Sequence, residues 1–161
     1  HIKKQNIKFN LLFTSALKRA QDTASIILEV IEESNINILK NEALNERDYG
    51  DLTGLNKDMA RQEFGEEQVQ IWRRSYSDGP PNGESLEDTY NRVIPYFKNE
   101  IMPALQKNKN VIISAHGNSL RALVKFIEEI SEEEIVKLEI ATGEPIFYEF
   151  NENKLQRKLN W

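Results

Sequence analysis

The chain contains no cysteine and only two histidines among its 161 residues. Without cysteine there are no disulfide bonds and no thiolate metal sites. Because His1 and His116 are the only imidazoles, we also expect no metal centre built on several histidines, and no metal. The absence of cysteine fits a reducing cytoplasm, where we predict the protein to be, although secreted bacterial proteins can also lack cysteine.

Long hydrophobic runs are missing as well. No segment approaches the roughly 18 consecutive apolar residues that a transmembrane helix needs. Residues 1–6, with the sequence HIKKQN, lack the pattern of a signal peptide. We therefore expect no membrane association.

Positive charge is in deficit, since 21 Lys and Arg face 26 Asp and Glu and the net charge is −5. This balance argues against a nucleic-acid binder that relies on overall charge. It still allows a local basic pocket, because the charge of a pocket is independent of the net charge. The remaining composition, 39% hydrophobic and 29% charged, is typical of one globular domain with a core.

Short apolar runs alternate with amphipathic stretches along the chain, which predicts an α/β protein. Strands are predicted over residues 9–13, 36–39, 111–115, 145–150 and 154–159. Helices are predicted after Ser15, which should cap the first of them, and over residues 56–64, 66–75, 85–101, 119–129 and 132–138. Ser85 and Asp88 should form a capping box, and Pro95 should kink the helix that they open.

These elements predict a single domain over residues 1–161. We expect a layered sandwich in which helices flank a mostly parallel sheet with an antiparallel edge. Ligands bind at the carboxyl ends of the strands in such sheets.

Two strand-to-helix junctions carry residues that suit phosphate chemistry. Arg19 falls near the start of a helix, where its guanidinium and the free helix N–H groups would both attract phosphate. A solvated surface arginine explains that position equally well. His116 ends a buried strand, and Gly117 and Asn118 after it allow close backbone approach and hydrogen bonding. A structural histidine is the alternative, but the strand end favours a functional one.

Two charged segments add further candidates. Glu46, in the loop from Leu44 to Lys57, is suited to general acid–base catalysis. Composition alone favours a solvated loop there. Adjacent arginines after Trp72 can clamp a carboxylate or phosphate through forked hydrogen bonds, although surface arginines explain them equally well. The anion-binding candidates of the two segments are Arg47, Tyr49, Lys57, Arg73 and Arg74.

The combination of segments decides among these alternatives. LNERDYGDLTGLNK over residues 44–57, residues 69–76 with WRRSY, and residues 115–122 together closely resemble the cofactor-dependent phosphoglycerate mutases of the histidine phosphatase superfamily. The match runs in the family's order over residues 9–150. The first two segments are specific to the mutases within the superfamily. The resemblance implies a glycolytic and gluconeogenic enzyme that interconverts 3-phosphoglycerate and 2-phosphoglycerate.

The resemblance also implies a role for each candidate. Arg19 and His116 match residues that hold the transferring phosphoryl group, with Gly117 and Asn118 beside them, and Glu46 matches the proton donor and acceptor. The residues that match those binding the carboxylate and phosphate of phosphoglycerate are Arg47, Tyr49, Lys57, Arg73 and Arg74. The implied mechanism is ping-pong transfer through a phosphohistidine, primed by 2,3-bisphosphoglycerate and without a metal.

One departure from the family concerns the nucleophile. The family carries its nucleophilic histidine in an Arg-His-Gly motif at the end of its first strand, and this sequence has no such motif. His1 precedes a strand that matches the family's second strand, so it is not the nucleophile. We therefore expect the domain to be incomplete at its N-terminus. Smaller departures are the short stretch over residues 77–82 and the end at Trp161 without a mobile tail.

Two other functions remain open. One is a broad-specificity histidine phosphatase, and the other is an inactive binding module for phosphorylated metabolites. The mutase-specific loop and the Arg73–Arg74 pair argue against the first, whereas the missing nucleophile favours the second for residues 1–161. The sequence leaves open the oligomeric state, with a homodimer among the options, and the balance of mutase and bisphosphatase activity.

Overall fold

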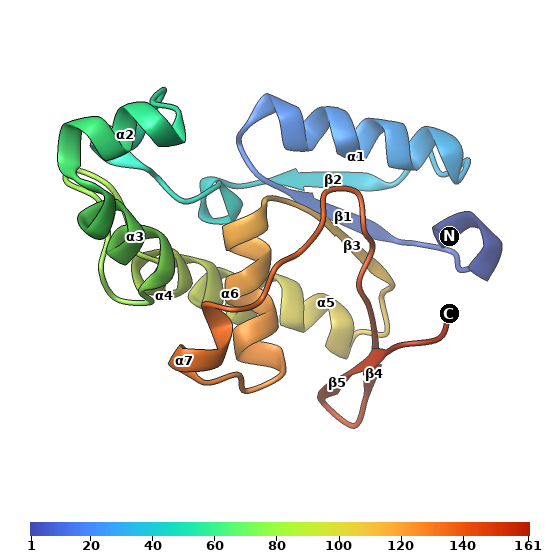
Figure 1. Ribbon diagram of the computed structural model, residues 1–161. Coiled ribbons are helices and arrows are strands. Elements are labelled where there is room, and N and C mark those ends of the chain that lie inside the picture. The colour runs from blue at the N-terminus through green and yellow to red at the C-terminus, as the bar shows by residue number, and fades with distance from the viewer.

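Three parallel strands form the centre of the fold in the computed structural model, which describes all of residues 1–161 (Figure 1). Strand β1 (Leu11–Thr14) lies between β2 (Asn37–Lys40) and β3 (Val111–Ser114). The register pairs Thr14 with Ser114 at the ends of β1 and β3. The carboxyl ends of the parallel strands therefore meet at one edge of the sheet, as the sequence predicts for a ligand site.

Helices cover both faces of this sheet. Helix α1 (Lys18–Val30) packs on one face, and α4 (Leu86–Tyr96) and α6 (Gly117–Ile127) lie on the other (Figure 1). Side chains of successive strand residues point to opposite faces. Accordingly Leu12 belongs to the buried cluster under α1, whereas Phe13 belongs to the cluster against α4 and α6.

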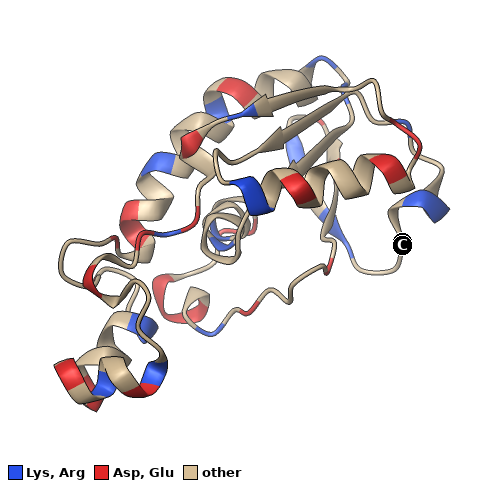
Figure 2. Ribbon diagram, turned by 90° about the horizontal axis from the view of Figure 1, so that it is seen from above, with Lys and Arg blue, Asp and Glu red and all other residues tan.

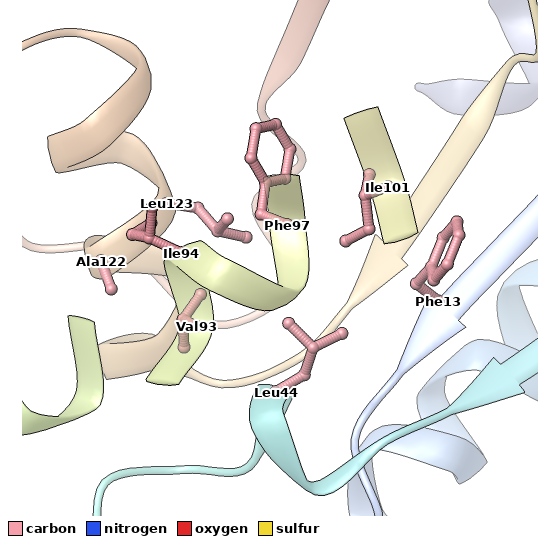
Figure 3. Packing of buried hydrophobic residues seen from close by; sticks show 8 residues of the cluster. All are labelled: Phe13, Leu44, Val93, Ile94, Phe97, Ile101, Ala122 and Leu123. Carbon is pink, nitrogen blue, oxygen red and sulfur yellow. The ribbon is translucent and has the colours of Figure 1, made fainter. Parts of the chain in front are cut away.

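The second of these clusters is the main core and is shown in Figure 3. Its members come from β1, from the segment after β2, from α4 with residues 97–101 that follow it, and from α6. None of them is more than 4% exposed. They are Phe13, Leu44, Val93, Ile94, Phe97, Ile101, Ala122 and Leu123. Full burial of a large apolar side chain contributes about 1.5–3 kcal/mol. Leu44 thus anchors to the core the chain segment that leads to Glu46.

The remaining elements are short. They are η1 (Ile2–Gln5), η2 (Glu42–Leu44), η3 (Gly50–Leu52), α2 (Lys57–Phe64), α3 (Glu66–Arg74), the π-helical turn η4 (Phe97–Ile101), α5 (Met102–Gln106), α7 (Glu132–Ile135), β4 (Phe147–Asn151) and β5 (Lys154–Lys158). Helices α2 and α3 pack together through a separate small cluster that includes Ala60 and Trp72. None of the helices combines the length and the apolar character that a bilayer crossing requires.

The predicted α/β class is confirmed, and several helix ends differ from the prediction. Ser85 and Asp88 form the predicted capping box. The helix passes through Pro95 without ending there, and it changes from α to π geometry two residues later. Ser15 is not the N-cap of α1, since that helix begins at Lys18 after Leu17.

Helix α6 also begins two residues earlier than predicted, at Gly117. The hydroxyl of Ser119 accepts a hydrogen bond from the main-chain N–H of His116 at 3.1 Å, which closes the first turn around these residues. Asn118 therefore lies inside the first helical turn and not in a preceding loop.

The antiparallel pair does not extend the central sheet. Strands β4 and β5 form a separate two-stranded sheet, and β3 pairs only with β1. The hairpin is instead attached through side chains. Leu155 packs against the main core, and Glu128 of the segment after α6 accepts hydrogen bonds from Tyr148 and Arg157. One edge of β3 therefore has no strand partner among residues 1–161.

Candidate active site

His116 lies where β3 ends and α6 begins, and it is only 7% exposed. Because β1 and β3 are parallel neighbours, the residue that follows β1 lies beside it. Ser15 Oγ is 2.8 Å from His116 Nε2. Burial lowers the pKa of His116, and the positive charge of Arg19 lowers that pKa further, whereas Glu46 opposes the shift. His116 is therefore a neutral imidazole at pH 7.

Two further hydrogen bonds fix this junction. The Thr14 hydroxyl donates to the carbonyl of Ser114 at 2.7 Å, and the Ser114 hydroxyl donates to the carbonyl of Ala20 at 3.0 Å. The first bond ties β1 to β3, and the second ties β3 to the first turn of α1. Arg19 and His116 are thereby held at the same edge of the sheet.

Glu46 lies against the first turn of α6. Its Oε1 accepts hydrogen bonds from the main-chain N–H groups of Asn118 at 3.2 Å and of Arg47 at 2.8 Å. Its Oε2 has no hydrogen-bond donor within the protein, and a Cβ added to Gly117 would lie 3.8 Å from that oxygen. The carboxylate is thus oriented through one oxygen, while the other faces the residue next to His116.

A chain of polar side chains continues from this point. Asn118 Nδ2 donates to the hydroxyl of Tyr49 at 2.9 Å, and Asn118 Oδ1 accepts from Arg121 Nη1 at 3.0 Å. Arg121 Nη2 donates to the carbonyl of Ile135 at 2.6 Å, and its Nε is buried without a partner. Burial and the neighbouring charge of Arg47 lower the pKa of Arg121. The side chain of Asn118 is therefore held from both sides.

Arg47 is buried, with 6% of its surface exposed. Its Nε donates to the carbonyl of Glu84 at 2.7 Å and its Nη2 to the carbonyl of Trp72 at 2.9 Å. Its guanidinium also lies 5.4 Å from the centre of the Tyr49 ring. Trp72 lies in the last turn of α3, where carbonyl groups attract cations. Arg47 therefore fastens α3 to the loop that carries Glu46.

Four predicted cations have no partner of their own. The side chains of Arg19, Lys57, Arg73 and Arg74 are exposed and take part in no hydrogen bond or ion pair within the protein. Arg74 lies near enough to Arg121 to contribute to the lowering of its pKa. Lys57 lies at the start of α2 and Arg73 in the last turn of α3. Neither side chain forms a hydrogen bond or ion pair with His116, Glu46 or Asn118. Elsewhere basic and acidic residues alternate over the molecule (Figure 2).

The structure brings Arg19, Glu46, His116, Gly117 and Asn118 together at the carboxyl edge of the sheet, with Tyr49 attached through Asn118. It also adds residues that sequence reasoning missed as parts of the site. These are Ser15 as the partner of His116, and Glu84, Arg92 and Arg121 around the Glu46 loop and Asn118.

Some of these omissions had a signal in the sequence. Ser15 and His116 each follow a strand closely, so adjacent parallel strands would place them together. Arg121 stands three residues after Asn118, a spacing that places both on one face of a helix. Arg92 had no such signal, because its partners in the 43–46 segment are 46 to 49 residues away. No group of three or more acidic or histidine side chains has the arrangement of a metal site.

Comparison with known proteins identifies the class of this domain. The sequence model of the histidine phosphatase superfamily (branch 1) matches residues 2–160. The alpha-ribazole phosphatase from Shigella flexneri superposes with a TM-score of 0.77 at 21% identity, over 96% of this chain and 74% of that one. At this identity the likeness concerns the fold alone. The chain belongs to the histidine phosphatase superfamily, branch 1.

Two relatives place it more narrowly. A protein of Bartonella bacilliformis named 2,3-bisphosphoglycerate-dependent phosphoglycerate mutase is 58% identical over 151 residues, which are 94% of this chain and 73% of that protein. The phosphoglycerate mutase of Schizosaccharomyces pombe is 56% identical over 152 residues, with 94% and 72% covered. The resemblance drawn from residues 44–57, 69–76 and 115–122 is thereby confirmed.

Proposed function

We propose that this protein is a 2,3-bisphosphoglycerate-dependent phosphoglycerate mutase, which interconverts 3-phosphoglycerate and 2-phosphoglycerate in the cytoplasm. The names of relatives at 56–58% identity support this function. The observation that carries it is the position of Glu46 Oε2, which has no donor of its own beside the first turn of α6. Neutral His116 and the unpaired Arg19 lie at the same edge.

Arg19 and His116 bind the transferring phosphoryl group in this proposal. A phosphoryl group in transfer spreads negative charge over its oxygens, so cations and donors placed in advance lower the barrier. Arg19 supplies a charge that no carboxylate of the protein neutralises. His116 supplies a neutral ring whose position is fixed by Ser15. The N-terminus of α6 adds main-chain N–H groups to the same edge.

Glu46 moves the proton. When the substrate hydroxyl attacks, a carboxylate oxygen accepts its proton, and when the hydroxyl departs the same oxygen returns it. Oε2 is available for this step because both N–H donors bind Oε1. Phosphoglycerate carries its hydroxyl and phosphate on neighbouring carbons, so one base at this position serves both directions of the reaction.

The exposed cations bind the non-reacting end of the substrate. Lys57, Arg73 and Arg74 have no carboxylate partners, and a guanidinium fork can hold a carboxylate or phosphate in two places. Arg47 and Tyr49 support this region, because the buried Arg47 fastens α3 to the loop and Tyr49 binds Asn118.

The same unpaired cations fit 2,3-bisphosphoglycerate, which has three anionic groups. When bound, this compound supplies the phosphoryl group that primes the enzyme. Arg19 and His116 would hold the phosphate near the reacting position, and Arg73 and Arg74 would hold the far end. No metal is required in this scheme, because guanidinium groups neutralise the charge.

The nucleophilic histidine is not supplied by residues 1–161. His116 is engaged with Ser15, and His1 makes an edge contact with the ring of Trp161. We infer that the nucleophile lies on a further strand that pairs with the free edge of β3. The open edge and the 73% coverage of the Bartonella relative support this inference. The protein isolated from its own cells should then have a mass above 18.7 kDa. A mass of 18.7 kDa with full activity would refute it.

The direct test of the function is a mutase assay on the full-length protein, with and without added 2,3-bisphosphoglycerate. Glu46→Gln keeps the shape of the side chain but cannot carry a proton. We expect kcat to fall by about 10²–10⁴-fold with little change in substrate binding. Glu42→Gln is the matched control, since Glu42 is an exposed glutamate of η2, four residues before Glu46, and should leave the rate unchanged.

Each alternative function gives a different result. Hydrolysis of phosphate esters without mutase activity would assign the protein to the phosphatases. Binding of phosphoglycerate without turnover of either kind would assign it to the binding modules. An unchanged turnover number in Glu46→Gln would remove Glu46 from the mechanism.

A further inference from the structure

Arg92 on α4 engages the main chain of the Glu46 loop with its whole guanidinium. Nη1 donates to the carbonyl of Ala43 at 2.8 Å. Nη2 donates to the carbonyls of Asn45 at 3.0 Å and Glu46 at 3.1 Å. Nε and Nη2 also bind the two carboxylate oxygens of Glu84 at 2.7 and 2.9 Å. Arg92 therefore holds the chain immediately before and at Glu46.

Glu84 holds the chain immediately after Glu46. Its Oε2 accepts the N–H of Asp48 at 2.9 Å, and its own N–H donates to the carbonyl of Asp48 at 2.7 Å. Its carbonyl accepts from Arg47 Nε at 2.7 Å. Burial would raise the pKa of Glu84, but the hydrogen bonds from Arg92 and from Asp48 outweigh it and hold that pKa below the usual range. Glu84 is thus a carboxylate at neutral pH.

Both side chains are shielded from water, with 26% of Arg92 and 24% of Glu84 exposed. A forked arginine–carboxylate pair of this kind has a defined geometry, unlike a flexible surface ion pair. The segment from residue 43 to residue 48 has little regular structure of its own, since it consists of the end of η2 and a loop. Its conformation therefore depends on contacts from outside, and most of the hydrogen bonds among them come from Arg92 and Glu84.

We infer that Arg92 and Glu84 are a positioning pair that sets the place of the Glu46 carboxylate relative to His116. This inference rests on the proposed role of Glu46 in proton transfer. Neither residue touches the substrate in this scheme. The pair acts through the main chain at Glu46, while the N–H of Asn118 fixes the other end of the same residue.

The test uses Arg92→Lys in the full-length protein. Lysine keeps the positive charge beside Glu84 but cannot form the fork to the carbonyls of Ala43, Asn45 and Glu46. A displacement of about 1 Å at a catalytic group can cost about 10²-fold in rate. We expect kcat for phosphoglycerate to fall about tenfold or more, with KM changed by less than about threefold.

A substrate with a different leaving group distinguishes a displaced Glu46 carboxylate from general damage to the active site. Release of p-nitrophenolate from p-nitrophenyl phosphate does not need a proton, so the burst rate with this ester should change far less than the mutase rate. The double variant Arg92→Lys with Glu46→Gln should be no slower than Glu46→Gln alone, because the pair acts only through Glu46. Glu84→Gln should give the same pattern with a smaller loss.

Arg157→Lys is the matched control, because Arg157 forms a comparably shielded pair with Glu128 away from the site. It should leave both rates unchanged. Equal losses with both substrates, or additive losses in the double variant, would overturn the inference and leave Arg92 with a structural role only. If Glu46→Gln itself had no effect, the proposed role of Glu46 in proton transfer would be refuted. A loss of rate in Arg92→Lys would then show that Arg92 acts through a residue other than Glu46, which would also overturn the inference.

Discussion

Two loops of the site region approach each other so closely that one position should accept only glycine. Gly50 has φ +50°, and a Cβ there would overlap the carbonyl oxygen of Pro81 and the nitrogen of Gly83. Gly54, four residues later, has φ +79° and no atom within 4 Å of such a Cβ. Alanine at either position meets the left-handed backbone, but only alanine at Gly50 also meets the opposite loop.

The difference between the two variants can be worked out from these contacts. A non-glycine residue in the left-handed region costs about 1–2 kcal/mol, which both variants share. Overpacking adds about 1–3 kcal/mol at Gly50. Separation of the loops would also weaken two main-chain hydrogen bonds, Asp51 N–H to Pro81 and Glu84 N–H to Asp48, at about 1 kcal/mol each. The free energy of unfolding of Gly50→Ala should therefore be about 3–5 kcal/mol lower than that of Gly54→Ala.

Urea unfolding followed by circular dichroism measures this difference directly. A domain of this size has a stability of about 5–15 kcal/mol, so the effect lies well within range. Gly50→Ala should also lower the mutase rate, because the displaced loop carries Tyr49. If the two variants unfold with the same free energy, within the roughly 10–15% error of extrapolation, the close approach of the loops does not govern stability.

Three further outcomes are expected. Leu44→Ala should destabilise the protein by about 2–5 kcal/mol in the same urea assay, since Leu44 is completely buried; a much smaller loss would mean that the core does not anchor the Glu46 segment. Because folding lowers the pKa of His116, the unfolded chain binds more protons below about pH 6.5. The protein should then lose stability relative to His116→Asn as the pH falls below that value, and parallel stability curves would contradict the shift. Replacement of Arg73 and Arg74 by alanine should cut the mutase rate by about tenfold or more per arginine but affect hydrolysis of a small phosphate ester much less. Equal losses in both assays would place the two arginines in the shared phosphate pocket.

Much of the fold was predictable because its strands and helices have local signatures. The Ser85–Asp88 capping box, the paired helices α2 and α3 and the β4–β5 hairpin all follow from short-range patterns. The separation of the hairpin from the central sheet was not predictable. It depends on which strand lies next to β3, and no local pattern encodes that neighbour.

In the site, too, features with a local sequence pattern were predictable and contacts between distant residues were not. The motifs around Glu46 and His116 could be found from residue types and from the family resemblance. The main chain on both sides of Glu46 is held by Arg92 and Glu84, on or just before a helix that begins 40 residues after Glu46. The position of Ser15 before a helix favours a capping role, and nothing in the sequence alone shows that its hydroxyl meets His116.

The strand order also has a consequence for synthesis of the protein. Strand β2 follows β1 after 22 intervening residues, but β3, which pairs with the other edge of β1, begins nearly 100 residues later. At about 5–20 residues per second, a ribosome takes about 5–20 s to make that stretch. During this interval β1 has one open edge, and the hydroxyl of Ser15 has no partner because His116 has not yet been translated. The open edge of β1 in a nascent molecule therefore needs protection from pairing with other strands until β3 has been made.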